Sequence, residues 1–162
     1  MGPRDFIETV RVPPFSAVNP EFEQRIRGSF ACQAFMTTLG ATLGRVEPGT
    51  VDIRMVIRPE LTQQHGFVHA GAVAAIGDSA CGYAALSLMP ADTGVLAVEY
   101  KINLMAPAVG EILIARGRVV RSGRTLSVCQ AEMVAVAAGT ERTVALLVST
   151  VMTVRDRPGV ID

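Results

Sequence analysis

Residues 65–89 read HGFVHAGAVAAIGDSACGYAALSLM, and this stretch decides the fold. Its small and apolar residues predict one long helix from Ala70 to Met89, which ends there because Pro90 disfavours helical geometry in the residue before it. Asp78 is the only charge in residues 70–88, a length close to that of a membrane span. Three glycines, two serines and the aspartate in this window favour instead a helix wrapped by the rest of its own protein.

The two faces of this helix differ in side-chain size. At 3.6 residues per turn, the bulky side chains fall on one side: Val73, Ile76, Tyr83 and Leu86. Small residues share the opposite side, with Asp78 near its centre: Gly71, Ala74, Gly82 and Ala85. Burying an unpaired carboxylate costs several kcal/mol. Two interpretations stay open: Asp78 pairs with an arginine or caps a loop, or it faces a cavity as a general base or nucleophile.

The segments around the helix predict antiparallel strands. Four apolar runs follow it with short turn-like links, at residues 94–104, 111–121, 125–136 and 143–154. Before the long helix we expect a first helix from Asn19 to about Thr38, ended by Gly40. A hairpin follows, with its turn at 47–49 and a strand over 51–57. Residues 59–68 then form a loop. The order predicts an α+β fold in which a curved antiparallel sheet wraps one long central helix. We divide the chain into an N-terminal extension (1–18), one domain (19–155) and a C-terminal tail (156–162).

Composition narrows the class of protein. The chain has 162 residues, of which 49% are apolar and 19% charged, so self-association is expected. Lys+Arg and Asp+Glu are equal at 15 each, which argues against nucleic-acid binding. Three widely spaced cysteines form no disulfide framework, and the N-terminus lacks the apolar core of a signal peptide. We therefore expect a cytoplasmic protein that crosses no membrane.

Metal and serine-triad chemistry find little support. His65 and His69 lie four residues apart, but Gly66 stands between them and the helix starts only at Ala70. A third ligand and the glutamate of an HExxH motif are missing from the sequence around them. The sequence also contains no serine in a GxSxG elbow. We expect no metal and no cofactor, with both histidines acting as hydrogen-bonding groups in a polar loop.

The start of the long helix offers a site for developing negative charge. Backbone N–H groups around Ala70 and Gly71 lie at the positive end of the helix dipole, and Gly71 permits close approach of a ligand. Asp78 lies about 10–12 Å further along the axis, so one helix does not aim both groups at one atom. Two antiparallel copies would, and the small-residue face then becomes a dimer face.

These residues carry a resemblance. The segment QQHGFVHAGAVAAIGDSACGYAA resembles the hotdog-fold acyl-CoA thioesterases of the phenylacetic-acid-degradation type, whose signature is Asn-x-x-Gly-x-x-His-Gly-Gly with an Asp seven residues on. Gly66, His69, Gly71 and Asp78 match this signature. Ala70 replaces the first of the two adjacent glycines, and Gln63 stands where an asparagine is typical. The resemblance extends over about residues 30–154, including the strand segments that begin with VEYKINLMAPAVG.

The resemblance implies hydrolysis of an acyl-CoA, with water as the final acceptor. Asp78 would activate water or attack the thioester carbonyl, and the Ala70 N–H would polarise that carbonyl. His69 and Gln63 would complete the catalytic set, and Gly66 and Gly71 would border the substrate. The site halves would come from opposite subunits of a homodimer or of a dimer of dimers. Ala97 stands where some relatives have Ser or Thr, and receives no role.

Four arginines surround the turn at residues 121–124: Arg116, Arg118, Arg121 and Arg124. The favoured interpretation is a solvated outer sheet face. The alternative is a site for the phosphates of coenzyme A, for which Arg121 and Arg124 are the better candidates. Two other functions stay open for the chain. One is a non-catalytic acyl-CoA-binding hotdog protein, and the less favoured one is an enoyl-CoA hydratase, which would need a differently placed acid–base pair.

Overall fold

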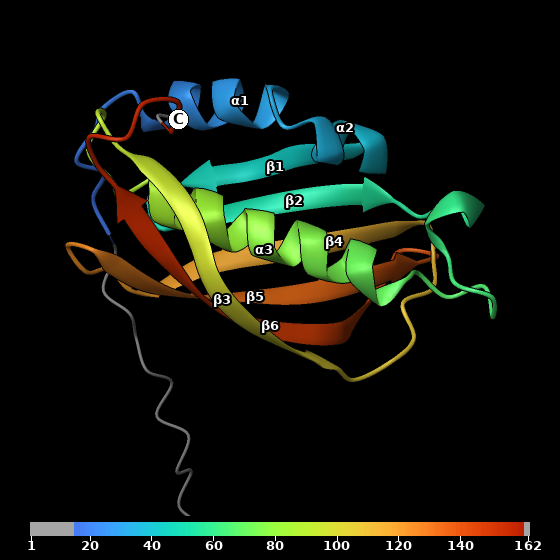
Figure 1. Cartoon of the computed structure of the whole chain (residues 1–162). Helices are drawn as coiled ribbons and strands as arrows, with labels where there is room; N and C mark the ends of the chain where they lie inside the picture. The colour runs from blue at the N-terminus through green and yellow to red at the C-terminus, as the bar shows by residue number, and fades with distance from the viewer. Residues whose placement is uncertain (1–14, 161–162) are drawn as a thin grey trace, which may run out of the picture.

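The fold is a six-stranded antiparallel sheet wrapped around one central helix, as the computed structural model of residues 15–160 shows (Figure 1). The strand order is β1-β2-β4-β5-β6-β3, so β1 and β3 are the two edges. The predicted α+β hotdog architecture is therefore confirmed. The elements are α1 Phe22–Ala31, α2 Ala34–Leu39, β1 Ala41–Glu47, β2 Thr50–Val56, a 3-10 turn Pro59–Leu61, α3 Ala70–Leu86, β3 Gly94–Leu104, β4 Ile112–Arg121, β5 Leu126–Ala137 and β6 Thr140–Val154.

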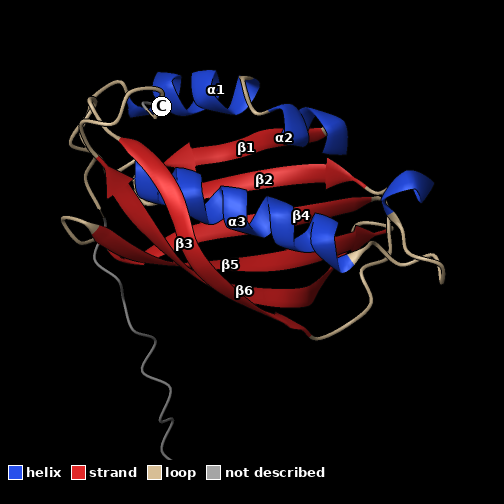
Figure 2. Ribbon diagram, in the orientation of Figure 1, coloured by secondary structure: helices blue, strands red, loops and turns tan. Residues whose placement is uncertain are grey.

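Alternation along the strands holds α3 against the concave face of the sheet. On β4, Leu113, Ala115, Gly117 and Val119 are buried towards the helix, whereas Arg118 is exposed on the outer face. Gly117 permits the closest approach, because a Cβ built there would lie 2.5 Å from the Ala80 backbone. The sheet therefore curves around α3 (Figure 2).

The bulky face of α3 forms the centre of the core. Ile76 and Leu86 are fully buried, and Val73 and Tyr83 nearly so. The helix keeps one partly accessible stripe along its length, formed by Gly71, Ala75, Asp78, Ser79 and Gly82. This stripe corresponds to the predicted small-residue face, except that Ala74 and Ala85 are buried. In the described part of the chain, residues 15–160, none of the helices is long and apolar enough to cross a membrane.

The N-terminal helix differs from the prediction. Instead of one helix from Asn19 to Thr38, the chain forms α1 and α2 with a break at Cys32 and Gln33. Gln33 is extended, with φ −83° and ψ 91°, and its side chain bonds to α3 rather than capping α2. Asn19 does not cap α1 either. Its Oδ1 accepts from the Glu21 N–H at 3.0 Å, in a turn that precedes the helix. Only the helix end at Gly40, with φ 65°, follows the prediction.

The remaining boundaries lie close to their predicted positions. α3 ends at Leu86 because Ser87 turns the chain, with its Oγ donating to Ala84 O at 2.6 Å and accepting from the Gly49 N–H at 2.7 Å. β6 starts three residues early, since Ala138 and Gly139 have positive φ and make a tight hairpin turn. The first fourteen residues of the predicted extension lie outside the described residues. The tail turns back so that Val160 O lies beside Gly94.

Candidate active site

The first turn of α3 is fixed by His69. This residue occupies the N-cap with φ −60° and ψ 136°, and its Nδ1 accepts a hydrogen bond from the Gly71 N–H at 2.9 Å. A Cβ at position 71 would lie 3.1 Å from that Nδ1, so the glycine also makes room for the imidazole. The predicted pair of free donors at Ala70 and Gly71 is therefore wrong, because His69 uses the second one.

The Ala70 N–H remains available at the helix start. Within residues 15–160 it donates no hydrogen bond, whereas the next two N–H groups of the helix bond to His69. Ala70 itself is exposed and lines a cavity of about 370 Å³. Most of the other lining residues are apolar: Phe67, Val68, Val73, Leu104, Met105, Ala106, Pro107, Ala108 and Val144. A single dipole-oriented donor at the edge of an apolar cavity is suited to polarising a carbonyl group.

Gln63 and Gly66 shape the loop that leads into this helix start. Gln63 lines the same cavity as Ala70. Its backbone O accepts from the Gly66 N–H at 2.9 Å, and its side-chain Oε1 accepts from the His65 N–H. Gly66 has φ +80°, a conformation that favours glycine, and open space surrounds the position of its missing side chain. The structure thus brings Gln63 and Ala70 together, and Gly66 forms the turn between them.

The two histidines have different surroundings. His65 is exposed in the loop and lies beside Gln64, while His69 caps α3. Across the described range 15–160, His, Cys, Asp and Glu side chains nowhere gather in a group of three that could hold a metal ion. His69 Nδ1 acts as an acceptor, which places the ring proton on Nε2.

Asp78 lies in the middle of the partly accessible stripe of α3 and has no internal partner. Its Oδ1 is buried without a hydrogen bond, and among residues 15–160 neither an arginine nor a loop N–H pairs with the carboxylate. Burial raises the pKa of Asp78 above its ordinary value because desolvation disfavours the charged form. Within residues 15–160 of one chain, Asp78 therefore has neither the arginine pair nor the loop cap of the purely structural interpretation.

A second cavity, of about 190 Å³, adjoins Asp78. Its lining combines α3, the break between α1 and α2, and the start of the edge strand β3: Gln33, Asp78, Ser79, Gly82, Tyr83, Val95, Leu96 and Ala97. Ala70 and Gln63 line the other cavity. Eight residues of helix separate Ala70 from Asp78, which is about 12 Å along the axis. One chain therefore holds the carboxylate and the free N–H in separate places.

The edge strand β3 continues the surface beside Asp78 and is unusually apolar. Leu96, Val98 and Tyr100 are 38%, 54% and 47% exposed, and Leu104 and Met105 at the far end are 54% and 52% exposed. Among residues 15–160, β3 pairs with no strand other than β6, so no strand lies along its other edge. Exposed edges of this kind are templates for pairing with another strand.

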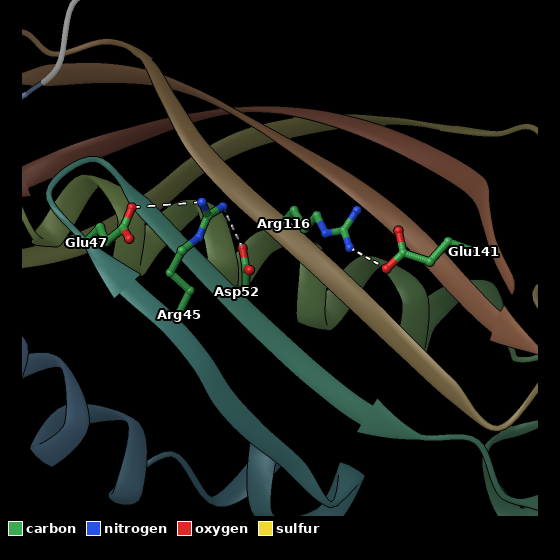
Figure 3. A network of polar contacts seen from close by, with 5 residues as sticks. All are labelled: Arg45, Glu47, Asp52, Arg116 and Glu141. Atoms are coloured by element: carbon green, nitrogen blue, oxygen red, sulfur yellow. Dashed lines mark hydrogen bonds and ion pairs between the residues drawn. The ribbon is translucent and has the colours of Figure 1, made fainter. Parts of the chain in front are cut away.

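The four arginines separate into two pairs. Arg116 bonds Glu141 at 2.6 Å (Figure 3). Arg118 bonds Gln130 at 2.9 Å, and both arginines lie on the outer face of the sheet. The Arg116 hydrogen bond lowers the pKa of Glu141. These two therefore fit the solvated-face prediction, as does the neighbouring Arg45, which bridges Glu47 at 3.8 Å and Asp52 at 3.3 Å.

Arg121 and Arg124 are exposed at the end of β4 and in the loop after it. The start of β4 lies beside the beginning of α3, because Val68 N–H bonds Ala108 O. Arg121 and Arg124 thus lie at the opposite end of their own chain from Ala70. The structure does not bring them to the helix start of the same subunit.

Three residues of the Asp78 cavity were missed by sequence reasoning. Ser79 and Tyr83 are four residues apart, so their spacing indicates two hydroxyls on one side of the helix, but it does not place them beside Asp78. Gln33 is remote in sequence and sits in a segment predicted to be plain helix, so no local pattern indicates its place in the cavity.

Comparison with known proteins adds the family. The sequence model of the Thioesterase superfamily matches residues 65–140, which include both Ala70 and Asp78. A thioesterase family protein from Silicibacter pomeroyi is 47% identical, with a TM-score of 0.82 over 83% of this chain and 98% of that one. A search of curated proteins finds no match.

Two structures connected with phenylacetic acid degradation have the same fold. The E. coli PaaI protein from the phenylacetic acid degradation operon is 21% identical, with a TM-score of 0.74 over 87% of this chain and 96% of that one. A phenylacetic acid degradation-related protein from Ralstonia eutropha is 22% identical, with a TM-score of 0.70 over 81% and 98%. At these identities the likeness concerns the fold.

Proposed function

The chain belongs to the thioesterase superfamily, and from this premise we propose that it hydrolyses an acyl-CoA thioester to a free acid and CoA. The observation that carries the proposal is Asp78, a carboxylate in the central helix whose Oδ1 is buried, unpaired and beside a cavity. Such a group is costly to keep, so a role in catalysis accounts for it better than a role in stability.

Asp78 acts in one of two ways in this proposal. As a general base it removes a proton from water while the water oxygen bonds to the carbonyl carbon, and the proton then leaves on the CoA sulfur as the C–S bond breaks. As a nucleophile it bonds to the carbonyl carbon while the C–S bond breaks and CoA leaves as the thiolate. Water then hydrolyses the mixed anhydride to the free acid and protonated Asp78, whose proton passes to the CoA thiolate. In both, negative charge develops on the carbonyl oxygen, which the Ala70 N–H stabilises as a dipole-oriented donor.

The proposed site is shared between two subunits. Asp78 and Ala70 line separate cavities of one chain, and the apolar β3 edge beside Asp78 is suited to pairing with β3 of a second copy. Antiparallel pairing would bring the partner's Ala70 and the partner's Gln63 towards Asp78, with His69 fixing each helix start and Gly66 and Gly71 bordering the substrate. We propose a homodimer, alone or as half of a dimer of dimers.

Arg121 and Arg124 are candidates for contact with the CoA phosphates. Both are exposed, and in the described residues neither has an ion-pair partner, unlike Arg116. Arginine forms bidentate bonds with phosphate oxygens, which suits this role. A CoA-linked substrate and the three free cysteines fit a reaction in the cytoplasm.

A panel of acyl-CoA thioesters tests the proposal directly. Release of free CoA is measured with a thiol-reactive disulfide reagent, and the oligomeric state is measured in parallel by analytical ultracentrifugation. We expect thiol release that depends on the acyl group, from a protein that sediments as a dimer or tetramer. Binding of acyl-CoA without thiol release would favour a non-catalytic binding protein instead. A fully active monomer would contradict the shared site.

A further inference from the structure

Gln33 joins the break between α1 and α2 to the helix that carries Asp78. Its Nε2 donates to Tyr83 Oη at 3.2 Å, and its Oε1 accepts from Ser79 Oγ at 3.2 Å. Ser79 and Tyr83 are four residues apart, so one amide spans two hydroxyls on the same side of α3. All three residues line the 190 Å³ cavity beside Asp78.

The break itself is held in place by contacts to the same tyrosine. The Phe30 and Tyr83 rings are 5.8 Å apart at an angle of 58°, and Ser29 Oγ lies 3.4 Å from Tyr83 Oη. Gln33 occupies the N-cap of α2, a position that favours a short capping side chain, yet it forms no cap. The hydrogen bonds of Gln33 to Ser79 and Tyr83 therefore explain its extended backbone better than capping of α2 does.

The amide of Gln33 keeps hydrogen-bonding capacity after these contacts. A glutamine side chain has two N–H donors and two acceptor lone pairs. Within the described residues the Gln33 side chain uses one donor for Tyr83 and one lone pair for Ser79. One donor and one acceptor therefore remain on a group that borders the cavity.

Position and volume limit what this group could bind. Ser79 and Tyr83 lie about 1.5 and 7.5 Å beyond Asp78 along the helix axis, and the Gln33 amide bonds to both. The cavity of about 190 Å³ is small, and both Asp78 and Gln33 line it. A ligand oxygen that reaches Gln33 would therefore lie a few bonds from the atom on which Asp78 acts.

We propose that Gln33 is a specificity-determining residue that hydrogen-bonds an oxygen on the acyl group, so that short 3-hydroxyacyl or 3-oxoacyl thioesters are preferred over their unsubstituted counterparts. This inference rests on the proposed thioesterase function. The inference adds a substrate preference to that function. The preference comes from Gln33, a polar residue of the Asp78 cavity that is remote from α3 in the sequence. A neutral hydrogen bond of this kind corresponds to a preference of about 5- to 10-fold.

The test compares 3-hydroxybutanoyl-CoA, as each enantiomer, with butanoyl-CoA. We expect the wild-type protein to show a kcat/KM ratio of about 5 to 10 in favour of one hydroxylated enantiomer. In Gln33→Leu, which is similar in size and apolar, the ratio should fall to about 1. The matched control is Gln24→Leu, an exposed glutamine of α1, which should keep the wild-type ratio. Lost stability lowers both rates equally, so a merely structural role leaves the ratio unchanged.

Every result other than the expected one counts against the role of Gln33. A wild-type ratio near 1 for both enantiomers, or a preference that persists in Gln33→Leu, overturns the inference while butanoyl-CoA hydrolysis leaves the thioesterase proposal standing. If Gln33→Leu does not fold, the wild-type ratio still decides, and Gln33→Asn, which shortens the side chain by one methylene, should lower it. If the acyl-CoA panel yields no thiol at all, both the proposed function and this inference fail.

Discussion

The first turn and the middle of α3 belong to one helix but meet opposite surroundings. At the first turn Ala70 is exposed, and its N–H is available while His69 takes the next one. In the middle, Asp78 is half-buried with an orphaned oxygen and a raised pKa. One region offers a positive dipole end to a ligand, and the other holds a base in a poorly solvated place. The helix spaces the two regions about 12 Å apart, too far to act together within one chain, which is why we propose that each region is half of a site.

The largest expected effect comes from removing the base at the middle of the helix. Asp78→Asn keeps the size of the side chain but neither accepts a proton nor attacks a carbonyl. We expect kcat for the best acyl-CoA to fall about 10²- to 10⁴-fold, with circular dichroism unchanged. Asp92→Asn, in the exposed loop before β3, is the matched control and should retain full activity. Unchanged turnover in Asp78→Asn would remove the middle of α3 from the mechanism.

The next effect comes from deleting the donor at the first turn. Ala70→Pro removes only the N–H, because proline is tolerated at the first helical position and His69 already has the extended geometry that a following proline requires. We expect kcat/KM to fall about 10²- to 10³-fold, as for loss of one oxyanion donor, with Tm nearly unchanged.

Ala70→Gly distinguishes the effect of the backbone N–H on activity from the effect of the Ala70 methyl group. This variant keeps the donor and widens the approach to it, so its activity should equal or exceed that of the wild type. If Ala70→Pro were as active as Ala70→Gly, the first turn would have no part in polarising the carbonyl.

Mixing the two inactive variants tests whether the halves come from different chains. Asp78→Asn and Ala70→Pro chains, co-expressed with different affinity tags, form mixed dimers in which one site has both defects and the other has neither. With random pairing about half of the dimers are mixed, so activity should return to about a quarter of the wild-type rate. Mixed dimers isolated through both tags but still inactive would place both groups in one site of one chain.

Most of the fold was readable from the sequence because its signals are local. Pro48 and Gly49 mark the first hairpin, Gly40 ends α2, and period-two alternation on β4 indicates which face meets the helix. The break at Gln33 was not readable. It depends on hydrogen bonds to Ser79 and Tyr83, some 50 residues away, that override local helix propensity.

The site was predicted in part for the same reason. Asp78 could be singled out because a lone charge in an apolar helix is locally visible, and the free donor at Ala70 follows from helix geometry. That His69 would use the Gly71 N–H depends on the rotamer of the imidazole, which spacing does not specify. The ion pair of Arg116 was likewise not predictable, because its partner Glu141 lies on β6 and comes near only through strand pairing.

The smallest expected effect concerns stability, and it sharpens the contrast between the two regions of α3. Because burial raises the pKa of Asp78, the folded chain binds this proton more tightly than the unfolded chain does, whose carboxyl titrates near pH 3.9. The folded state therefore loses stability as pH rises from about 4 through the raised pKa. Asp78→Asn lacks this titration.

We therefore expect Asp78→Asn to melt about 2 °C above the wild type at pH 7.5, with the difference vanishing at pH 3.5. Ala70→Pro should show no such pH-dependent difference, because no ionisable group changes at the first turn. Calorimetric melting of all three proteins at both pH values, in one buffer series of constant ionic strength, measures the effect. A wild type that is the more stable protein at pH 7.5 would mean that the Asp78 carboxylate has a stabilising partner in solution, and that the middle of α3 is not a strained half-site.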